Sequence, residues 1–178
     1  MVTSVMTRKQ TVRYGAVTGM LLLASSGSLQ ALPEDSEQPI IGVYESSLML
    51  LDEGKQVFYG SAEAPAEITQ GTLRIRGLEI TIERQDGKIR NATVSGTPAH
   101  FEQIPSASQP LVTAEGDTII MNYETQHVSA DGNVRFTQGE DSWTGCHVDY
   151  YMETRQLSTP RCENGEPSRA VITPRNNR

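Results

Sequence analysis

A repeated segment is the feature that most constrains the fold of this 178-residue chain. Residues 67–83 (EITQGTLRIRGLEITIE) align without a gap on residues 135–151 (RFTQGEDSWTGCHVDYY), 68 positions further along. The alignment matches a Thr-Gln-Gly triplet in both copies and places Gly77 on Gly145. The apolar positions of one copy hold different apolar residues in the other. This pattern indicates that turns fix the register of paired strands, whereas the apolar positions only have to remain apolar.

Within the repeat, apolar residues alternate with polar ones. In the first copy Leu73 and Ile75 precede Gly77, and Ile80 and Ile82 follow it, with arginine, glutamate and threonine between them. A period of two is typical of strands, because successive side chains of a strand point to opposite faces. The segment SSLMLLDEG (residues 46–54) comes nearest to helical spacing, and it fits a strand that runs into a turn equally well. We therefore predict an all-β fold beyond residue 33.

A coarser repeat comprises four hairpin units, each with two apolar residues separated by one position, six further residues and a third apolar residue. The triplets are Leu48, Leu50 and Val57; Ile80, Ile82 and Ile89; Ile119, Met121 and Val128; and Val148, Tyr150 and Leu157. The six-residue spacers contain glycine or short polar pairs that are typical of turns. Each unit has room for about four short strands, so about 16 strands are expected in stacked units.

The N-terminal residues have the layout of a secretory signal peptide. A basic segment, the apolar run GAVTGMLLLA (residues 15–24) and a small-residue stretch follow one another. The run is too short to cross a bilayer, which takes about 20 residues. We expect cleavage after Ala31, or alternatively after Ser28; a buried N-terminal helix is the other interpretation. The expected organisation is a signal peptide over 1–31, one β domain over 32–165 and a flexible tail over 166–178, in an exported protein.

Charge and motif content exclude several classes of function. The formal net charge is −7, and it falls to about −10 without the leader, which contains three basic residues and no acid. Nucleic acid is therefore not an expected partner, because its binding depends on clustered cations. His100, His127 and His147 occur singly, with no nucleophile elbow, phosphate loop or metal cluster around them. We expect no catalytic residues, no metal and no cofactor.

Cys146 and Cys162 are the only cysteines. In an exported chain, two cysteines usually form one disulfide. Free thiols remain the alternative, whereas a redox or metal pair would need a CxxC motif or a nearby histidine ligand, and neither occurs.

The order of several segments resembles the OstA-like family of periplasmic proteins. The most specific parts are residues 96–101 (GTPAHF), residues 114–116 (AEG) and residues 132–139 (GNVRFTQG). The resemblance extends from about Leu32 to Leu157. It implies a twisted, partly open antiparallel β-jelly roll of about 16 strands that carries lipopolysaccharide across the periplasm. The two cysteines depart from the family pattern. The long SAEAPAE segment (residues 61–67) departs from the repeat.

The resemblance also implies the partners. Lipopolysaccharide would lie with the acyl chains of lipid A in an apolar trough, since each CH₂ group exposed to water costs about 0.8 kcal/mol. The inner-membrane component LptC, the outer-membrane component LptD and further copies of the chain would join head-to-tail by adding strand to strand at open sheet edges. Such a contact does not close on itself and therefore builds filaments. A secreted β-sandwich that binds carbohydrate or protein without lipid is the alternative function, and an enzyme on the same scaffold is a third.

Two sets of residues are predicted to carry this function. The residues expected to line the lipid trough are Leu48, Leu50, Ile68, Ile75, Ile80, Ile82, Phe101, Ile119, Met121, Phe136, Trp143, Val148 and Tyr150. The residues expected on edge strands that contact partners are Ile40, Ile41, Val43, Val148, Tyr150 and Leu157. Each lining residue could instead be ordinary packed core. The aromatic residues of the second repeat copy are expected to narrow the trough near its C-terminal end.

Overall fold

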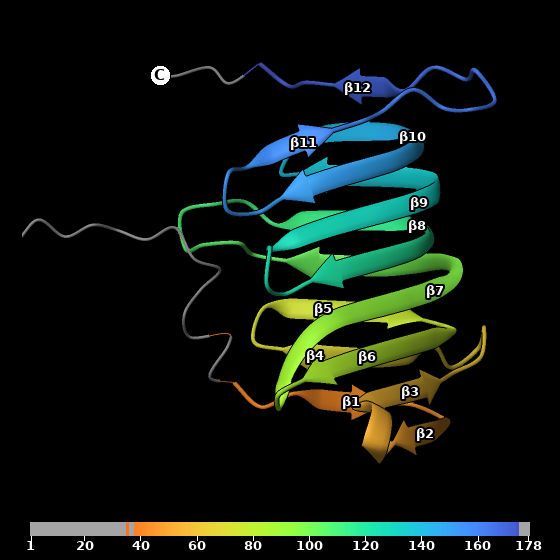
Figure 1. Cartoon of the computed structure of the whole chain (residues 1–178). Coiled ribbons are helices and arrows are strands. Elements are labelled where there is room, and N and C mark those ends of the chain that lie inside the picture. The colour runs from red at the N-terminus through yellow and green to blue at the C-terminus, as the bar shows by residue number, and fades with distance from the viewer. Residues whose placement is uncertain (1–34, 36–37, 175–178) are drawn as a thin grey trace, which may run out of the picture.

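The computed structural model describes Asp35 and residues 38–174, so the predicted signal peptide lies outside the described residues. The described part consists of antiparallel strands and one short 3-10 turn (Figure 1). The elements are β1 (Ile41–Val43), β2 (Ser46–Leu50), η1 (Leu51–Glu53), β3 (Lys55–Tyr59), β4 (Ala66–Gln70), β5 (Leu73–Gly77), β6 (Glu79–Gln85), β7 (Lys88–Gln103), β8 (Val112–Asn122), β9 (His127–Gln138), β10 (Asp141–Tyr151), β11 (Gln156–Ser158) and β12 (Arg169–Val171). None of the described residues forms a helix long and apolar enough to cross a membrane.

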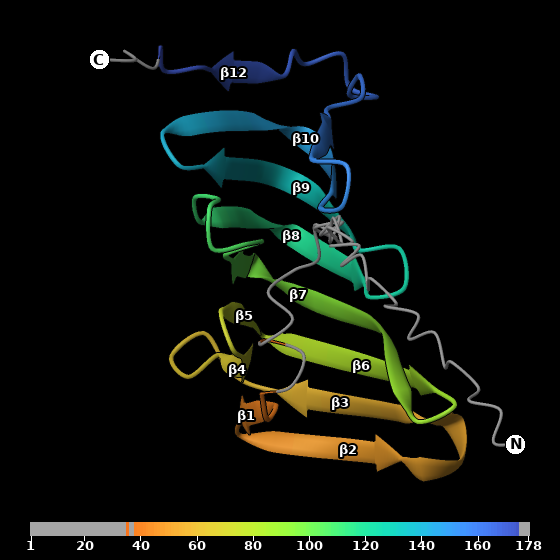
Figure 2. The same ribbon diagram turned by 90° about the vertical axis from the view of Figure 1, so that its left-hand side faces the viewer.

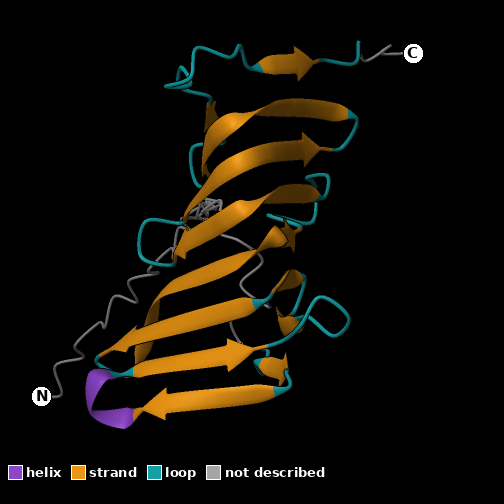
Figure 3. Ribbon diagram, turned by 90° about the vertical axis from the view of Figure 1, so that its right-hand side faces the viewer, coloured by secondary structure: helices purple, strands orange, loops and turns teal. Residues whose placement is uncertain are grey.

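All strands belong to one sheet, which folds into two layers because β7 to β10 bend and cross from one layer to the other. Layer A contains β2, β3, β6, β11 and the parts of the long strands at residues 88–95, 118–122, 127–131 and 147–151. Layer B contains β1, β4, β5, β12 and the remaining parts, at residues 99–103, 112–116, 134–138 and 141–145. Figure 2 and Figure 3 show the strands stacked from β1 and β2 at one end to β12 at the other. The sheet does not close into a barrel, which confirms the predicted open antiparallel β fold.

The described residues form 12 strands, and the expectation of about 16 short strands was wrong. The difference lies in the four long strands β7 to β10, because each of them runs through both layers as a single strand. Shifts of register occur between Ser95 and Ala99, between Glu115 and Thr118, and between Gly145 and His147. Such bulges bend a strand and increase its twist without ending its ladder of hydrogen bonds. Gly96, Gly116 and Gly145 lie at these shifts of register, where the strands turn between the layers.

Both copies of the long repeat fold into the expected hairpin in layer B. Gly71 and Gly139 occupy the turns with φ angles of 58° and 62°, which only glycine adopts without strain. Ile68 pairs with Ile75 in the first copy, and Phe136 pairs with Trp143 in the second. The turns thus fix the same register twice, although the apolar residues differ.

The four hairpin units also form as predicted, as β2–β3, β6–β7, β8–β9 and β10–β11. Met121 pairs with Val128 in the third unit and Tyr150 with Leu157 in the fourth. In the second unit Ile89 pairs with Arg84 and not with Ile82, because a bulge follows Glu83 and the turn is short.

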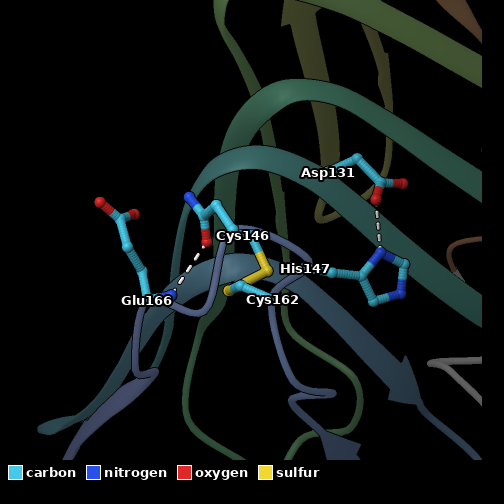
Figure 4. Close-up of a disulfide and its surroundings, with 6 residues drawn as sticks. Asp131, Cys146, His147, Cys162 and Glu166 are labelled. Atoms are coloured by element: carbon cyan, nitrogen blue, oxygen red, sulfur yellow. Dashed lines mark hydrogen bonds and ion pairs between the residues drawn. A yellow bond between two sulfur atoms is a disulfide. The ribbon is translucent and has the colours of Figure 1, made fainter.

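The sheet extends past residue 165, where the sequence analysis placed its end. Residues 169–171 form β12, which pairs with Ser142–Thr144 of β10, so a flexible tail over all of 166–178 was wrong. The predicted disulfide joins Cys146 of β10 to Cys162, with 5.8 Å between their Cα atoms (Figure 4). This bond holds the segment before β12 against β10. A Cβ at Gly145 would lie 2.6 Å from Ser168 Oγ, so glycine permits this close approach.

Removing the disulfide should destabilise the protein. A double substitution Cys146→Ser and Cys162→Ser should lower the free energy of unfolding by about 3 kcal/mol, because a bond across 16 residues restricts the unfolded chain. Urea denaturation of the oxidised protein and of the variant measures the difference. Reduction of the natural protein should give the same loss and should leave the variant unchanged. Equal stability of oxidised protein and variant would contradict the prediction.

Candidate functional site

The space between the two layers is the candidate site, and cross-strand pairing aligns its side chains in rows. In layer A one inward row comprises Phe58, Ile80, Val94, Ile119, Ala130 and Val148. The neighbouring row of that layer comprises Gln56, Ile82, Ala92, Met121, Val128, Tyr150 and Leu157. In layer B the facing row comprises Gly42, Ile68, Ile75, Phe101, Ala114, Phe136, Trp143 and Ala170. These rows run from one end of the stack to the other.

Most of the predicted lining residues face this interior. They are Ile68, Ile75, Ile80, Ile82, Phe101, Ile119, Met121, Phe136, Trp143, Val148 and Tyr150, and all of them are buried except the partly buried Trp143. They pack against one another as one hydrophobic cluster. The same side chains are therefore both the core of the fold and the surface that a ligand between the layers would contact.

Leu48 and Leu50 do not face the interior, and their predicted lining role was wrong. Leu48 pairs with Val57, whose neighbours in β3 are the inward-facing Gln56 and Phe58, so Leu48 and Leu50 point to the opposite face. Leu48 is 47% exposed there. The sequence is ambiguous at this position because β2 and β3 each contain consecutive apolar residues, which fit either face.

A cavity of about 250 Å³ opens between the layers at the N-terminal end of the stack. It is lined by Ile40, Gly42, Tyr44, Gln56, Phe58, Ile68, Ile82, Arg84 and Ile89. The ring of Tyr44 packs against that of Phe58 with 4.9 Å between centroids. Because Gly42, Ile68, Phe58 and Ile82 belong to the inward rows, this cavity is the end of the interior itself.

Aromatic side chains occupy the interior towards its C-terminal end. The ring of Phe136 lies 5.8 Å from that of Trp143 and 5.1 Å from that of Tyr150, measured between centroids. The Tyr150 hydroxyl is buried without a hydrogen-bond partner among the described residues. Desolvation raises the pKa of Tyr150, and the charge of Arg155 only partly opposes it. Whether these rings narrow the path for a ligand stays a prediction.

The two layers are joined on one side only. The bends of β7 to β10 connect them on that side, and the turns of both layers lie on the other side (Figure 1). On this second side, called the open side below, the described strands make no pair between the layers. Among the described residues, side-chain packing is what holds the layers together there.

Free strand edges occur at both ends of the stack. β1 and β2 each pair on one side at the N-terminal end, and β11 and β12 do so at the C-terminal end. Ile40, Ile41 and Val43 are exposed at the first end, and Leu157 lies on β11 at the second.

Val148 and Tyr150 were wrongly placed at the C-terminal edge. Both are buried on β10, and β11 and β12 continue the sheet beyond that strand. Among the described strands, the free edge at this end therefore belongs to the short β11 and β12 and not to β10.

The structure brings together histidines that the sequence analysis treated as separate. On the outer face of β9 and β10, His147 contacts Asp131 at 2.5 Å (Figure 4). It also contacts Asp149 at 3.0 Å. His127 contacts the other oxygen of Asp149 at 2.8 Å and stacks on Tyr151. The register of the β9–β10 hairpin could have predicted this cluster, because paired residues of the two strands face the same side of the sheet. Within the described range, no such group is arranged to hold a metal ion.

The carboxylates of this cluster favour protonation of His147. Desolvation lowers the pKa of His147, but hydrogen bonds and charges from Asp131 and Asp149 outweigh it, and the net shift is upward. Desolvation raises the pKa of Asp149, and its contacts with both histidines overcome this effect and lower it. The ion pair of His147 and Asp149 therefore stabilises the folded state when both groups are charged.

Comparison with known proteins shows the same fold and sequence pattern. Residues 52–156 match the family described as "LptA/(LptD N-terminal domain) LPS transport protein". The lipopolysaccharide export system protein LptH of Pseudomonas aeruginosa is 31% identical over 160 residues, which cover 89% of this chain and 87% of that protein.

The solved structures include one with a closely similar arrangement of strands. It is the crystal structure of LptH from the same bacterium, described as the LptA-homologous periplasmic component of the lipopolysaccharide transport device. It superposes with a TM-score of 0.69 at 24% identity, and the match covers 80% of this chain and 100% of that one. This likeness supports the open antiparallel fold.

The histidine cluster predicts a pH-dependent stability. Because the pKa of His147 is raised above its ordinary 6.5, its contribution is complete below that value and is lost as pH rises through the folded-state pKa. The free energy of unfolding should therefore fall on going from about pH 6 to about pH 8.5. Urea denaturation across this range should show a shallower fall for His147→Gln. Thr144→Val, on the same outer face, should keep the natural slope; an unchanged slope in His147→Gln would contradict the assignment.

Proposed function

Because this chain belongs to the LptA and LptD N-terminal domain family of lipopolysaccharide transport proteins, we propose that it carries lipopolysaccharide with the acyl chains held between its two layers. The proposed location is the periplasm, after cleavage of residues 1–31 as a signal peptide. Family membership favours transport over the alternative of a carbohydrate-binding or protein-binding sandwich without lipid. We propose no catalytic role, since the relatives are named as transport components.

One observation carries this proposal: the inward rows are apolar over nearly their whole length and reach both ends of the stack. The row of layer B runs from Gly42 at the N-terminal edge to Ala170 at the C-terminal edge. Moving a 12-carbon acyl chain through water exposes methylene groups at a cost of about 10 kcal/mol. A continuous apolar path removes most of that cost at every position along the stack.

The open side supports a route by which lipid enters. The interior residues already pack against one another, so an acyl chain must replace some of those contacts with its own. On the open side this replacement breaks no hydrogen bond of the sheet, because the described strands make no ladder between the layers there. Separation of the layers about their bent side would therefore exchange one set of apolar contacts for another.

The free edges at the two ends support head-to-tail assembly. β1 and β2 offer unpaired backbone groups at one end, and β11 and β12 offer them at the other. Joining the two kinds of edge would continue the sheet, and the inward rows with it, from copy to copy. By the same contacts, the ends would dock on LptC at the inner membrane and on LptD at the outer membrane.

Crosslinking from adjacent positions on opposite faces tests the lipid path. A photoreactive residue at Phe58, which faces the interior, should form an adduct with lipopolysaccharide. The same group at Leu48, which lies on the outer face of the neighbouring strand, should give little or no adduct. Mass spectrometry or a lipid-specific blot after irradiation measures both. Equal labelling from the two positions, or labelling of protein alone from Phe58, would rule out the interior path.

Charged residues on the N-terminal edge should weaken assembly. Ile41 and Val43 are 57% and 64% exposed on β1, and lysine at both positions should oppose the approach of another strand. Light scattering over a range of concentrations should show a rise in mass for the natural protein and a much smaller rise for the double variant. Ile120→Lys, which places a charge in the middle of layer A, should assemble normally. Unchanged assembly of the double variant would exclude β1 from the contact.

A further inference from the structure

The turn between β6 and β7 concentrates positive charge on an otherwise acidic protein. Residues 84–90 contain Arg84, Lys88 and Arg90, with Asp86 as the one acid among them, whereas the whole chain has a net charge of −7. All three basic side chains are exposed. The turn lies on the open side of the stack, where the layers are not joined by paired strands.

This turn adjoins the cavity at the N-terminal end of the interior, where Ile40, Ile68, Ile82 and Phe58 lie beside the polar Gln56. Arg84 is the one charged residue that lines that cavity. A second hollow, of about 660 Å³, shares Ile89 with the first and is also lined by Lys88, Arg90, Asp86, Glu124, Gln85 and Tyr123. Of its two basic residues, Arg90 is paired with Glu124. A ligand that reached across Ile89 would therefore meet the cavity at the end of the interior on one side and a rim that carries Lys88 on the other.

Two of the three cations lack an anionic partner within the described part of the chain. Arg90 forms an ion pair with Glu124 at 3.5 Å and also contacts Gln85. The described residues place no ion pair on Arg84 or Lys88, whereas Arg74 on layer B has both Glu67 and Glu102 within 4 Å. Arg84 and Lys88 are therefore available to an anion from outside.

Tyr123 adds a neutral donor at the same place. It packs against the core cluster and also lines the second hollow. Burial raises the pKa of its hydroxyl well above the ordinary value, so the group keeps its proton and can donate a hydrogen bond.

Building on the proposed function, we propose that Arg84 and Lys88 bind a phosphate of the headgroup of an acylated lipid whose acyl chain lies along Ile68, Ile82 and Phe58 in the adjacent cavity. Burying the chain places the headgroup at the rim, because the polar part must stay in water. Charge-assisted hydrogen bonds from a guanidinium and an ammonium group then hold the phosphate, and Arg84 can make two at once. The anion thus fixes the position of the lipid, while the cavity supplies most of the affinity.

Binding of two lipids that differ only in phosphate tests this site. The probes are bisphosphorylated lipid A and the same lipid with its phosphates removed. The natural protein should bind the phosphorylated form about tenfold more tightly, and higher salt should reduce that preference. The double variant Arg84→Gln and Lys88→Gln should lose the preference and bind the dephosphorylated lipid as the natural protein does. Fluorescence titration of the full chain measures each dissociation constant.

The control removes two charges elsewhere. Arg76→Gln with Arg135→Gln alters the outer face of layer B, where the described residues give neither arginine an ion pair, and it should keep the tenfold preference. Equal binding of both lipids by the natural protein, or loss of the preference in the control, would overturn the phosphate site and leave the carrier function intact. Failure of both lipids to bind would instead overturn the carrier function. Binding of inorganic phosphate as tight as that of the lipid would show a free-anion site and contradict a lipid headgroup site.

Discussion

The hydrogen-bond ladder of β7 to β10, which is interrupted at the bulges where the strands bend and resumes in the second layer, is the constraint on which the structure depends. Because the same strands build both layers, the bent side is held by backbone hydrogen bonds. On the opposite side, the described strands make no backbone pair between the layers. A protein built this way resists separation at one side and permits it at the other, which suits an interior that must admit a large amphipathic molecule.

The rows of side chains explain how such an interior can run the length of the molecule. Antiparallel pairing places apolar residues opposite one another from strand to strand, so apolar side chains line the interior along the whole stacking direction. Its N-terminal end is a cavity, and its C-terminal half is filled by Phe136, Trp143 and Tyr150. The basic turn at residues 84–90 lies beside the cavity, so the polar and apolar parts of one lipid would find separate surfaces within a short distance.

Much of the fold could be predicted from the sequence because turns are local signals. The repeated Thr-Gln-Gly triplets mark real hairpins, and the four apolar triplets mark four real hairpin units. Burial of Ile75 or Phe101 follows from alternation alone. Alternation cannot tell the inner face from the outer face where several apolar residues are consecutive, and Leu48 was therefore assigned to the wrong face. Long-range features were also missed: β12 reaches the sheet through a distant pairing, and the contacts of His147 depend on the register of β9 against β10.

The disulfide between Cys146 and Cys162 determines when the last strand, β12, is held in place beside β10. Disulfides form outside the reducing cytoplasm, so a newly exported chain reaches the envelope with these two sulfurs still apart. Until they join, nothing covalent retains the segment that precedes β12 beside β10. In the proposed head-to-tail assembly, the C-terminal face of each molecule would therefore be complete only after this disulfide has formed, and a subunit would become able to bind the next one in the compartment where the assembly takes place.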